Sequence, residues 1–289
     1  MGALRSVEVV DQAVAAAAQA AERGGLTIRQ LDEVEQIENA VDLFRSIWGP
    51  EERDIVGVAT MRALSHSGNY VFGAYLGSEL VGAITGFIGW HEGDLQLHSH
   101  VLGVSPAAQG TNVGFTLKEH QRGWALAKGI KKVTWTYDPL VSRNAYFNLA
   151  KLGASVTTYY PSFYGLMNDE INGHDESDRV LIEWDLESPR AIDASTGISV
   201  APDADGLRDS GAEIALAVGD GEKPDQTTVS SDSVLVAIPR DIVQLRHKDP
   251  ALAHEWRVAL RDVMGSALQD GYVTVGMTRA GYYVLERSR

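Results

Sequence analysis

Apolar residues recur at steps of three and four in some stretches of the chain and at alternate positions in others, which predicts both helices and strands. Residues 32–48 show the helical spacing and end at Gly49, a residue that commonly stops a helix. Residues 70–90 hold two β-rich runs around Gly77 and Ser78, which predicts a hairpin. The same patterns predict further helices over about 8–23, 55–65, 112–128 and 142–152, and further strands over 26–31, 95–104, 131–137, 154–160 and 179–186. This order predicts an α/β fold in which helices flank a mixed central sheet.

The pattern changes after residue 187. Glycine, aspartate, serine and proline accumulate as far as residue 231, with ISVAP and EIALAV as short strand candidates. The chain then continues with the strand VLVAIP, a long helix that begins at Asp249 and Pro250, and a hairpin in which TRAG joins YVTVGM to YYVLER. We therefore expect three parts: an N-terminal helical arm over 1–25, a main α/β domain over 26–187 and a small C-terminal αβ subdomain over 188–289.

Composition narrows the classes of function. The formal net charge is −14 and no cluster of lysine and arginine appears, which disfavours nucleic-acid binding. No apolar run approaches the ~20 residues of a membrane span, and the N-terminus lacks the basic start of a signal peptide, so we expect a cytoplasmic protein. The absence of cysteine excludes disulfides, thiolate-bound metals and a cysteine nucleophile.

The candidate chemistry lies in LHSHVLGVSPAAQGTNVGF, residues 97–115. Side chains alternate along a strand, so His98 and His100 are expected on one face and able to act at one site. After them a loop leads into a helix whose exposed N–H groups and dipole favour a phosphate or pyrophosphate. Gly110 and Gly114 would let the backbone approach such a ligand closely. The loop has neither the lysine of a Walker loop nor the three glycines of the dinucleotide fingerprint.

The strand, loop and helix together resemble the acyl-CoA-binding motif of the GNAT N-acyltransferase superfamily, Q/R-x-x-G-x-G/A. Gln109 stands at the first position of that motif, Asn112 at the position of the middle glycine and Gly114 at the last. Asparagine departs from the pattern, but it tolerates left-handed backbone better than most residues. The segment SRNAYFNLAKLGA is similar to the family's helix that ends in Lys-Leu-Gly-Phe, with Ala154 in place of the aromatic residue. The resemblance covers roughly residues 27–187 and implies a GNAT-like fold for the main domain.

The segment HSHVLGV is similar to the strand His-x-His-Val-Leu-Ala-Val of the arylalkylamine N-acetyltransferases. This resemblance implies that His98 and His100 belong to a proton path. An amine is mostly ammonium at neutral pH, and a histidine with an ordinary pKa of ~6.5 can accept its proton. The resemblance also implies acetyl-CoA or another acyl-CoA as co-substrate, held by the strand and the loop. The residues assigned to this cofactor are Leu102, Gly103, Val104, Gln109, Gly110, Thr111, Asn112, Val113 and Gly114.

Two helices supply further candidate residues. The family often places a tyrosine, the acid for the leaving thiolate, where this chain has Leu149, so Tyr146 one turn earlier is the candidate acid. Arg143, near the start of the same helix, is the candidate for binding a substrate carboxylate. Lys118 and Arg122, four apart on the cofactor helix, are interpreted as solvated surface residues.

Simpler interpretations stand beside these. The two histidines could instead be packed, hydrogen-bonded core residues, or metal ligands together with His91, Glu92 or Asp94. We assign no metal site, because no second cluster with ligand spacing appears. Asp178 and Arg179 are expected to form a local ion pair rather than a catalytic group.

These observations predict an N-acyltransferase that moves an acetyl or succinyl group from acyl-CoA directly to a small primary amine, with amino acids among the candidate acceptors. No acyl-enzyme is expected, because no cysteine exists and no serine lies beside a histidine in an elbow motif. Two alternatives stay open. One is a GNAT-fold protein that binds acyl-CoA without turning it over, which Leu149 and Asn112 favour; the other is a metal-dependent hydrolase that uses the His-x-His pair. A homodimer is compatible with the sequence, whereas nucleic acids and membranes are not expected partners.

Overall fold

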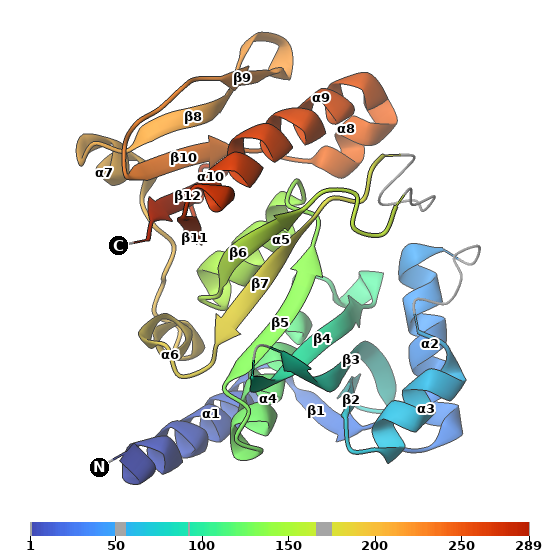
Figure 1. Ribbon diagram of the computed structural model, residues 1–289. Coiled ribbons are helices and arrows are strands. Elements are labelled where there is room, and N and C mark those ends of the chain that lie inside the picture. Colours follow the sequence, from blue (N-terminus) through green and yellow to red (C-terminus); the bar gives the residue numbers. More distant parts are fainter. Residues whose placement is uncertain (1, 50–55, 92, 166–174, 289) are drawn as a thin grey trace. The chain divides into compact units, whose positions relative to one another are not determined.

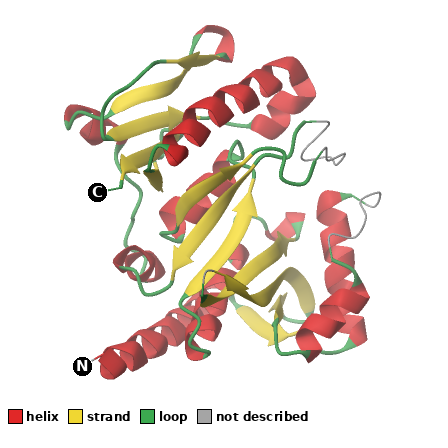
Figure 2. Cartoon of the chain, viewed as in Figure 1, coloured by secondary structure: helices red, strands yellow, loops and turns green. Residues whose placement is uncertain are grey.

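The computed structural model describes residues 2–49, 56–91, 93–165 and 175–288, and its helices and strands alternate as an α/β protein (Figures 1 and 2). Contacts gather the chain into two compact units. The first holds the residues up to Trp135 together with Asp185–Thr196, and the second holds Thr136–Trp184 together with the residues from Gly197 onward. The contacts thus group residues 136–184 with the C-terminal region, whereas the sequence pattern grouped them with the main domain. The domain boundaries drawn from the sequence stay a prediction.

The first unit contains a sheet in which the strands follow their order in the chain, from β1 to β5. Strands β1 to β4 pair antiparallel, and β5 runs parallel to β4. The predicted hairpin around Gly77 and Ser78 is confirmed, since β2 and β3 meet there. The strands are β1 (Leu26–Gln30), β2 (Tyr70–Leu76), β3 (Glu79–His91), β4 (Asp94–Val104) and β5 (Lys132–Tyr137), the last of which continues into the second unit.

Helices cover both faces of this sheet. A Cβ on Gly103 of β4 would come within 2.8 Å of Phe44, so one helix packs directly on that strand. A Cβ on Gly82 of β3 would come within 3.2 Å of Leu117, so another helix lies equally close to the opposite face. The helices of this unit are α1 (Gly2–Gly24), α2 (Val34–Trp48), α3 (Val58–His66), the short η1 (Pro106–Ala108), α4 (Val113–Ala127) and α6 (Pro189–Ser195). Helix α2 carries Phe44 and helix α4 carries Leu117, so the sheet is the middle layer of the unit.

The strands of the second unit follow the order β7-β6-β11-β12-β10-β8-β9. Neighbouring strands pair antiparallel where their register is described, except that β10 runs parallel to β8. The hairpin predicted around TRAG is confirmed by the pairing of β11 with β12. The strands are β6 (Ser155–Tyr160), β7 (Arg179–Asp185), β8 (Glu213–Val218), β9 (Pro224–Gln226), β10 (Ser233–Ala237), β11 (Tyr272–Met277) and β12 (Tyr282–Arg287).

The helices of the second unit include two with wide π turns. Asp249 accepts a hydrogen bond from the backbone N–H of Leu252, and Pro250 is the first helical residue, so the predicted helix start is confirmed. The helices are α5 (Ser142–Tyr146), continued by the π turn η2 (Phe147–Lys151); α7 (Ala204–Asp209); η3 (Asp220–Glu222); α8 (Ile242–Lys248); and α9 (Pro250–Leu260), continued by the π turn η4 (Arg261–Gly265) and α10 (Ser266–Gln269).

After residue 187 the structure differs from the sequence-based expectation in one strand and three short helices. EIALAV forms β8 as predicted, but ISVAP is not a strand. An alternating apolar pattern of three residues does not by itself provide the neighbouring strand with which backbone N–H and C=O groups must form hydrogen bonds. The short helices α6, α7 and α8 were not predicted, because pieces of six or seven residues show too few turns for a periodic pattern.

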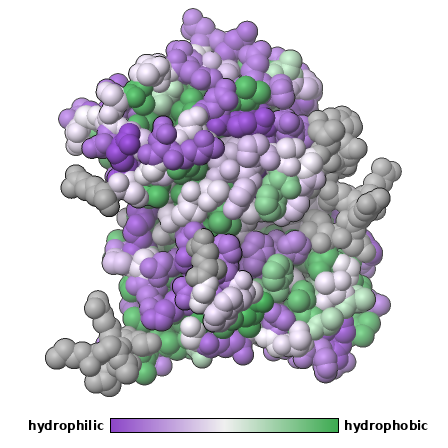
Figure 3. Space-filling model, viewed as in Figure 1, coloured by the Kyte–Doolittle hydropathy of each residue, from purple (hydrophilic) through white to green (hydrophobic). Residues whose placement is uncertain are grey.

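No described helix combines the length and apolarity that a membrane crossing requires. Hydrophilic side chains are spread over the face drawn in Figure 3, with hydrophobic ones between them. This mixed surface agrees with a net charge of −14 that is distributed along the sequence.

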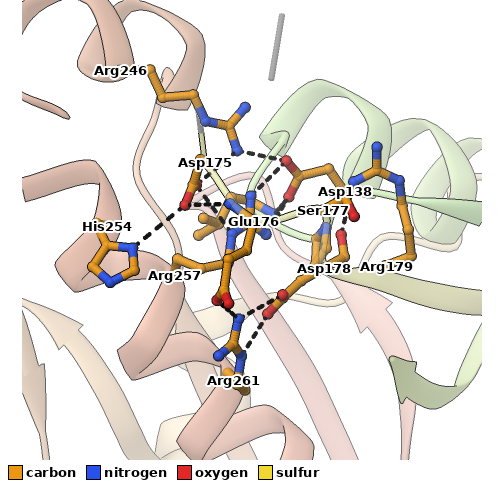
Figure 4. Close-up of polar contacts among 12 residues, drawn as sticks. Asp138, Asp175, Glu176, Ser177, Asp178, Arg179, Arg246, His254, Arg257 and Arg261 are labelled. Carbon is orange, nitrogen blue, oxygen red and sulfur yellow. Dashed lines mark hydrogen bonds and ion pairs between the residues drawn. The ribbon is translucent and has the colours of Figure 1, made fainter. Parts of the chain in front are cut away.

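A buried ion-pair network in the second unit surrounds Asp138, the residue that follows β5 (Figure 4). The guanidinium of Arg257 donates to both carboxylate oxygens of Asp138, at 2.8 Å each, and Arg246 donates at 2.6 Å. Burial alone would raise the pKa of Asp138, but the charges and hydrogen bonds of these arginines hold it below its usual range. The network therefore ties the end of β5 to helices α8 and α9.

A second carboxylate of the network, Asp178, corrects an expectation. Its side chain accepts hydrogen bonds from Arg261, at 2.9 and 2.7 Å, and from the hydroxyl of Tyr159 at 2.6 Å. Arg179 donates instead to the backbone carbonyl of Asp178, at 2.9 Å. The ion-pair partner of Asp178 is thus Arg261 of the π turn η4 and not its sequence neighbour. As expected, the carboxylate is engaged in holding the fold.

Helix α4 buries a further pair of charged residues inside the first unit. Arg122 donates from Nε and Nη2 to the carbonyl oxygen of Leu186, at 3.0 and 2.8 Å. Glu119, only 1% exposed, lies with Oε2 4.0 Å from Arg122 Nη1, and neither of its oxygens has a hydrogen-bond partner among the described residues. Burial raises the pKa of Glu119 to about 7, although Arg122 opposes the shift. This carboxyl group therefore weakens the fold when it ionises.

Substitution Glu119→Gln should stabilise the chain in a pH-dependent way. With a pKa of about 7 in the folded protein, Glu119 binds a proton more tightly than in the unfolded chain. The ionisation of Glu119 lowers the free energy of unfolding. This loss is absent below about pH 4.5, grows as the pH rises and is complete above about pH 7, where it reaches up to about 3 kcal/mol. Urea unfolding at pH 5 and pH 8 measures the difference. A gap between variant and parent that is equal at both pH values would contradict this prediction.

Substitution Asp138→Asn should destabilise the chain by roughly 3–5 kcal/mol, because it removes the charge that compensates buried arginines. The matched control is Asp205→Asn, since Asp205 is 90% exposed in its pair with Arg208, at 3.9 Å. That exposed pair should contribute no more than about 1 kcal/mol. Chemical unfolding of the full chain measures both, and equal losses in the two variants would show that the Asp138 network contributes no more than a surface pair.

Candidate functional site

The site begins at a bulge in β4. Val101 pairs with Thr85 and Ser99 pairs with Gly86, so His100 is an extra residue on the β4 side. The rings of His98 and His100 lie 6.3 Å apart between centroids. The expected closeness of the two histidines is confirmed, and the bulge, which the sequence did not reveal, sets how His100 is aimed.

A phenylalanine of the neighbouring strand lies beside both histidines. Phe87 of β3 pairs with His98 across the hairpin, and its ring centroid lies 5.1 Å from that of His98 and 6.0 Å from that of His100. The side chain of Phe87 is 38% exposed, His100 is exposed and His98 is half-buried. The three rings therefore form one group that is partly open to solvent.

His98 is held in its neutral form. Its Nδ1 lies 3.2 Å from the hydroxyl oxygen of Thr134 on β5. Burial lowers the pKa of His98 to about 4, and the charges of His100 and Lys118 act in the same direction. The ordinary histidine pKa assumed from the sequence is therefore wrong for His98. At neutral pH this ring carries no charge and can accept a proton.

The interpretation of Lys118 and Arg122 as solvated surface residues is wrong. Lys118 is 4% exposed; its Nζ donates to Ser99 Oγ at 2.9 Å and lies 3.7 Å from the ring centroid of Trp135. Arg122 is fully buried. The reason is that α4 has the sheet on one side and α1 on another, where the hydroxyl of Thr116 reaches the carbonyl of Ala20. Lys118 thus connects α4 to the strand that carries the histidines.

The loop between β4 and α4 leaves N–H groups available at the start of the helix. Asn112 adopts the left-handed conformation, with φ 64° and ψ 9°, as its tolerance for that region predicted. The first bond of the helix runs from the N–H of Thr116 to the carbonyl of Asn112, at 2.9 Å. The N–H groups of Val113, Gly114 and Phe115 precede that bond and point along the helix axis. With the helix dipole they form a suitable site for an anion.

The strand part of the predicted cofactor site lies beyond the pairing of β4 with β5. In the described residues that pairing joins Leu97 to Val133 and His98 to Thr134, whereas β4 continues to Val104. Leu102 and Val104 are half-buried, and Gly103 is buried against α2. A ligand can therefore use the backbone of this stretch.

The exposed part of the predicted cofactor site is the loop. Gln109, Gly110, Thr111 and Asn112 are exposed, whereas Val113 is buried. Gly110 has a φ of +83°, and a Cβ there would meet nothing within 4 Å. The assignment of these residues to acyl-CoA stays a prediction, and the geometry is compatible with it.

The two candidates from the α5 region, Arg143 and Tyr146, lie in the second unit together with Leu149, the residue matched by register to the family's tyrosine. Arg143 is exposed, Tyr146 is half-buried at the end of α5, and Leu149 is fully buried in the π turn. A π turn adds a residue to the helical count, so a comparison by simple register does not fix which side chain replaces the tyrosine of related enzymes. The roles of Arg143 and Tyr146 stay predictions.

The metal alternative finds no further ligands in the described part of the chain. Within those residues no three His, Asp or Glu side chains gather in a way that could hold a metal ion. His91 pairs with Asp94 at the tip of the hairpin, and Glu92 lies outside the described residues.

Three residues of the site were missed by sequence reasoning. Thr134 and Lys118 contact the histidine strand from elements distant in the sequence, and no local pattern announces such contacts. Phe87 had a usable signal. The pairing of His91 with Asp94 sets a register that places Phe87 opposite His98.

One family model and several solved structures are similar to this chain. Residues 32–153 match the model of the acetyltransferase (GNAT) family. A putative acetyltransferase of Salmonella typhimurium, solved with its cofactor acetyl-CoA, is 18% identical, with 62% of this chain and 98% of that chain covered and a TM-score of 0.45. The ribosomal-protein-S18-alanine N-acetyltransferase of Escherichia coli is 13% identical, with 56% and 95% covered and a TM-score of 0.45. No curated protein matches the sequence.

The matched residues include β4 with its two histidines, the loop at Asn112 and the whole of α4. They end at Gly153, after the Lys-Leu-Gly segment that the sequence resemblance used. The part of this chain from residue 32 to residue 153 is therefore a domain of the acetyltransferase (GNAT) family.

Proposed function

We propose that this protein is an N-acyltransferase that moves an acetyl group, or another short acyl group such as succinyl, from acyl-CoA to a small primary amine. The observation that carries the proposal is one continuous segment: the histidine pair of β4, the left-handed turn at Asn112 and the open N-terminus of α4. A proton acceptor and an anion site thus lie on adjoining parts of the same strand, loop and helix.

The anion site fits the pyrophosphate of coenzyme A. The net charge of −14 repels anions at long range, so an anionic co-substrate needs local donors. The N–H groups at the start of α4 supply them, and the exposed loop from Gln109 to Asn112 has no bulky side chain at Gly110. Backbone N–H groups around Leu102 to Val104 are the proposed contacts of the thioester end and would stabilise charge that develops on its carbonyl oxygen.

The histidine pair fits the proton chemistry of amide formation. The amine nitrogen attacks the thioester carbonyl carbon, the C–N bond forms, the C–S bond breaks and coenzyme A leaves as a thiolate. The proton of the ammonium group must first be removed, and neutral His98 can accept it. Because its pKa is low, His98 holds the proton only in passing, and exposed His100, 6.3 Å away, offers a route to solvent.

The remaining roles complete the proposal. A thiolate with an ordinary pKa of ~8.5 is a good leaving group, so a modest acid such as Tyr146 suffices to protonate it. Arg143, which is exposed, is the proposed partner for the carboxylate of an amino-acid acceptor. If Arg143→Ala left the KM for amino acids unchanged, this last role would be wrong.

One alternative has an observation in its favour. Leu149, which is buried, aligns by sequence register alone with the acidic tyrosine of related enzymes, and this favours a protein that binds acyl-CoA without turning it over. Thiol release from acetyl-CoA and succinyl-CoA, over a panel of D- and L-amino acids and arylalkylamines, separates the two functions. Turnover supports the transferase; silence with both donors, together with calorimetric binding of coenzyme A, supports the binding protein.

Substitution Gly110→Ala should weaken coenzyme A binding. Gly110 and Gly77 both have positive φ, +83° and +63°, with nothing within 4 Å of a new Cβ, so alanine strains the backbone similarly at each. That strain is about 1–2 kcal/mol, and at Gly110 its release would move the loop. Calorimetry should show roughly 5- to 30-fold weaker binding for Gly110→Ala and no change for Gly77→Ala. Equal affinities in both variants would remove the loop from the cofactor site.

Substitutions His98→Ala and His100→Ala should each lower kcat/KM at pH 7 by about 100-fold or more. Activity should recover partly at pH 9, because a larger fraction of the amine is then neutral. His66→Ala, an exposed histidine at the end of α3, is the matched control and should leave kcat/KM unchanged. In the parent protein the ring of His98 should show no NMR titration between pH 5 and 8, since its pKa is about 4. A titration near pH 6.5 would refute the proposed neutral acceptor.

A further inference from the structure

The hydroxyl of Thr134 lies beside one particular nitrogen of His98. Strands β4 and β5 run parallel with His98 paired to Thr134, and Thr134 Oγ1 lies 3.2 Å from His98 Nδ1. Thr134 is buried, and a β-branched side chain has few rotamers, so its hydroxyl oxygen has little freedom to move. The other ring nitrogen, Nε2, has no part in this contact.

Both strands are fastened immediately after this pair. Ser99 follows His98 on β4, and Trp135 follows Thr134 on β5. The ammonium group of Lys118 contacts both: Nζ donates to Ser99 Oγ at 2.9 Å and lies 3.7 Å from the ring centroid of Trp135. Because side chains alternate along a strand, Lys118 does this from the opposite face of the sheet. The distance between the His98 ring and the Thr134 hydroxyl is therefore fixed from both strands.

The contact with Thr134 decides which atom of His98 can accept a proton. Burial lowers the pKa of His98 to about 4, and the charges of His100 and Lys118 act in the same direction, so the ring is neutral at pH 7. A neutral imidazole has one N–H group, and its other nitrogen is the acceptor. A hydroxyl oxygen can accept from Nδ1–H in the neutral ring and in the protonated one. A hydroxyl that donated to Nδ1 would have to turn away before the ring took up a proton there.

We propose that Thr134 is a positioning residue which holds His98 in the tautomer with the hydrogen on Nδ1, so that Nε2 is the atom that accepts the proton of the amine. The inference rests on the proposed transferase function. Nδ1–H donates to Thr134 Oγ1 before and after the transfer, while one N–H bond of the ammonium group breaks and a new one forms at Nε2. The hydroxyl therefore needs no rearrangement during the step, as preorganised groups in catalytic sites do not.

Nitrogen-15 NMR of the His98 ring at pH 7 measures the tautomer without any turnover. We expect the hydrogen on Nδ1 in the parent and in Thr134→Ser, which keeps the hydroxyl. Thr134→Val keeps a similar shape but lacks the oxygen, so a substantial fraction of its rings should carry the hydrogen on Nε2. Thr157→Val is the matched control, because Thr157 on β6 donates to Glu183 Oε1 at 3.1 Å, and it should leave His98 as in the parent. A hydrogen on Nε2 in the parent, or an unchanged tautomer in Thr134→Val, overturns the inference.

Steady-state kinetics separate this role from a purely structural one. Thr134→Val should lower kcat by about 10-fold, the effect of one lost hydrogen bond, and leave the KM for acyl-CoA within about 2-fold. Thr134→Ser should restore most of kcat, and Thr157→Val should match the parent. If no amine is acylated but the tautomer depends on Thr134, the transferase function fails and the positioning of His98 stands. Turnover with an unchanged kcat in Thr134→Val overturns the inference while the function stands.

Discussion

The left-handed turn at Asn112 is the constraint on which the predicted site depends. It lets the chain leave β4 and start α4 within a short loop, so that the open N–H groups of the helix lie close along the chain to the histidines. Few residues other than glycine adopt this conformation without a penalty of about 1–2 kcal/mol, and asparagine is among those that tolerate it. Lys118 then fastens the helix to the same strand through Ser99. Strand, loop and helix are thus held as one piece, which a site for a large flexible cofactor requires.

Burial sets the charge state of the groups around this piece. The sheet and α1 cover α4 from two sides, so Lys118, Glu119 and Arg122 are removed from water. Desolvation lowers the pKa of Lys118 and raises that of Glu119, because in each case the charged form loses its hydration. The same effect keeps His98 neutral. Burial therefore produces both the shifted pKa values of the charged residues on α4 and a neutral proton acceptor, His98, on β4.

In the second unit, buried charged residues are paired with residues of opposite charge. Around Asp138, arginines from α8 and α9 meet the carboxylates at close range, and the pKa of Asp138 is held low although it is buried (Figure 4). Such pairs contribute little net stability compared with apolar packing, but removing one partner is costly. The network fixes the end of β5 and the segment that begins at Asp175 to the C-terminal helices. This connection explains why residues 136–184 gather with the C-terminal region rather than with the rest of the predicted domain.

The sequence by itself determined the elements and the location of the predicted site. Strongly periodic helices, the hairpins around Gly77 and TRAG, and the helix start at Asp249 follow from local preferences, so they could be predicted. The strand, loop and helix of residues 97–115 were recognisable for the same reason, since their motif is contiguous. Only the tertiary structure decided the bulge at His100, the low pKa of His98 and the burial of Lys118. These depend on residues brought together from distant parts of the chain, and desolvation cannot be read from a side chain's neighbours in sequence.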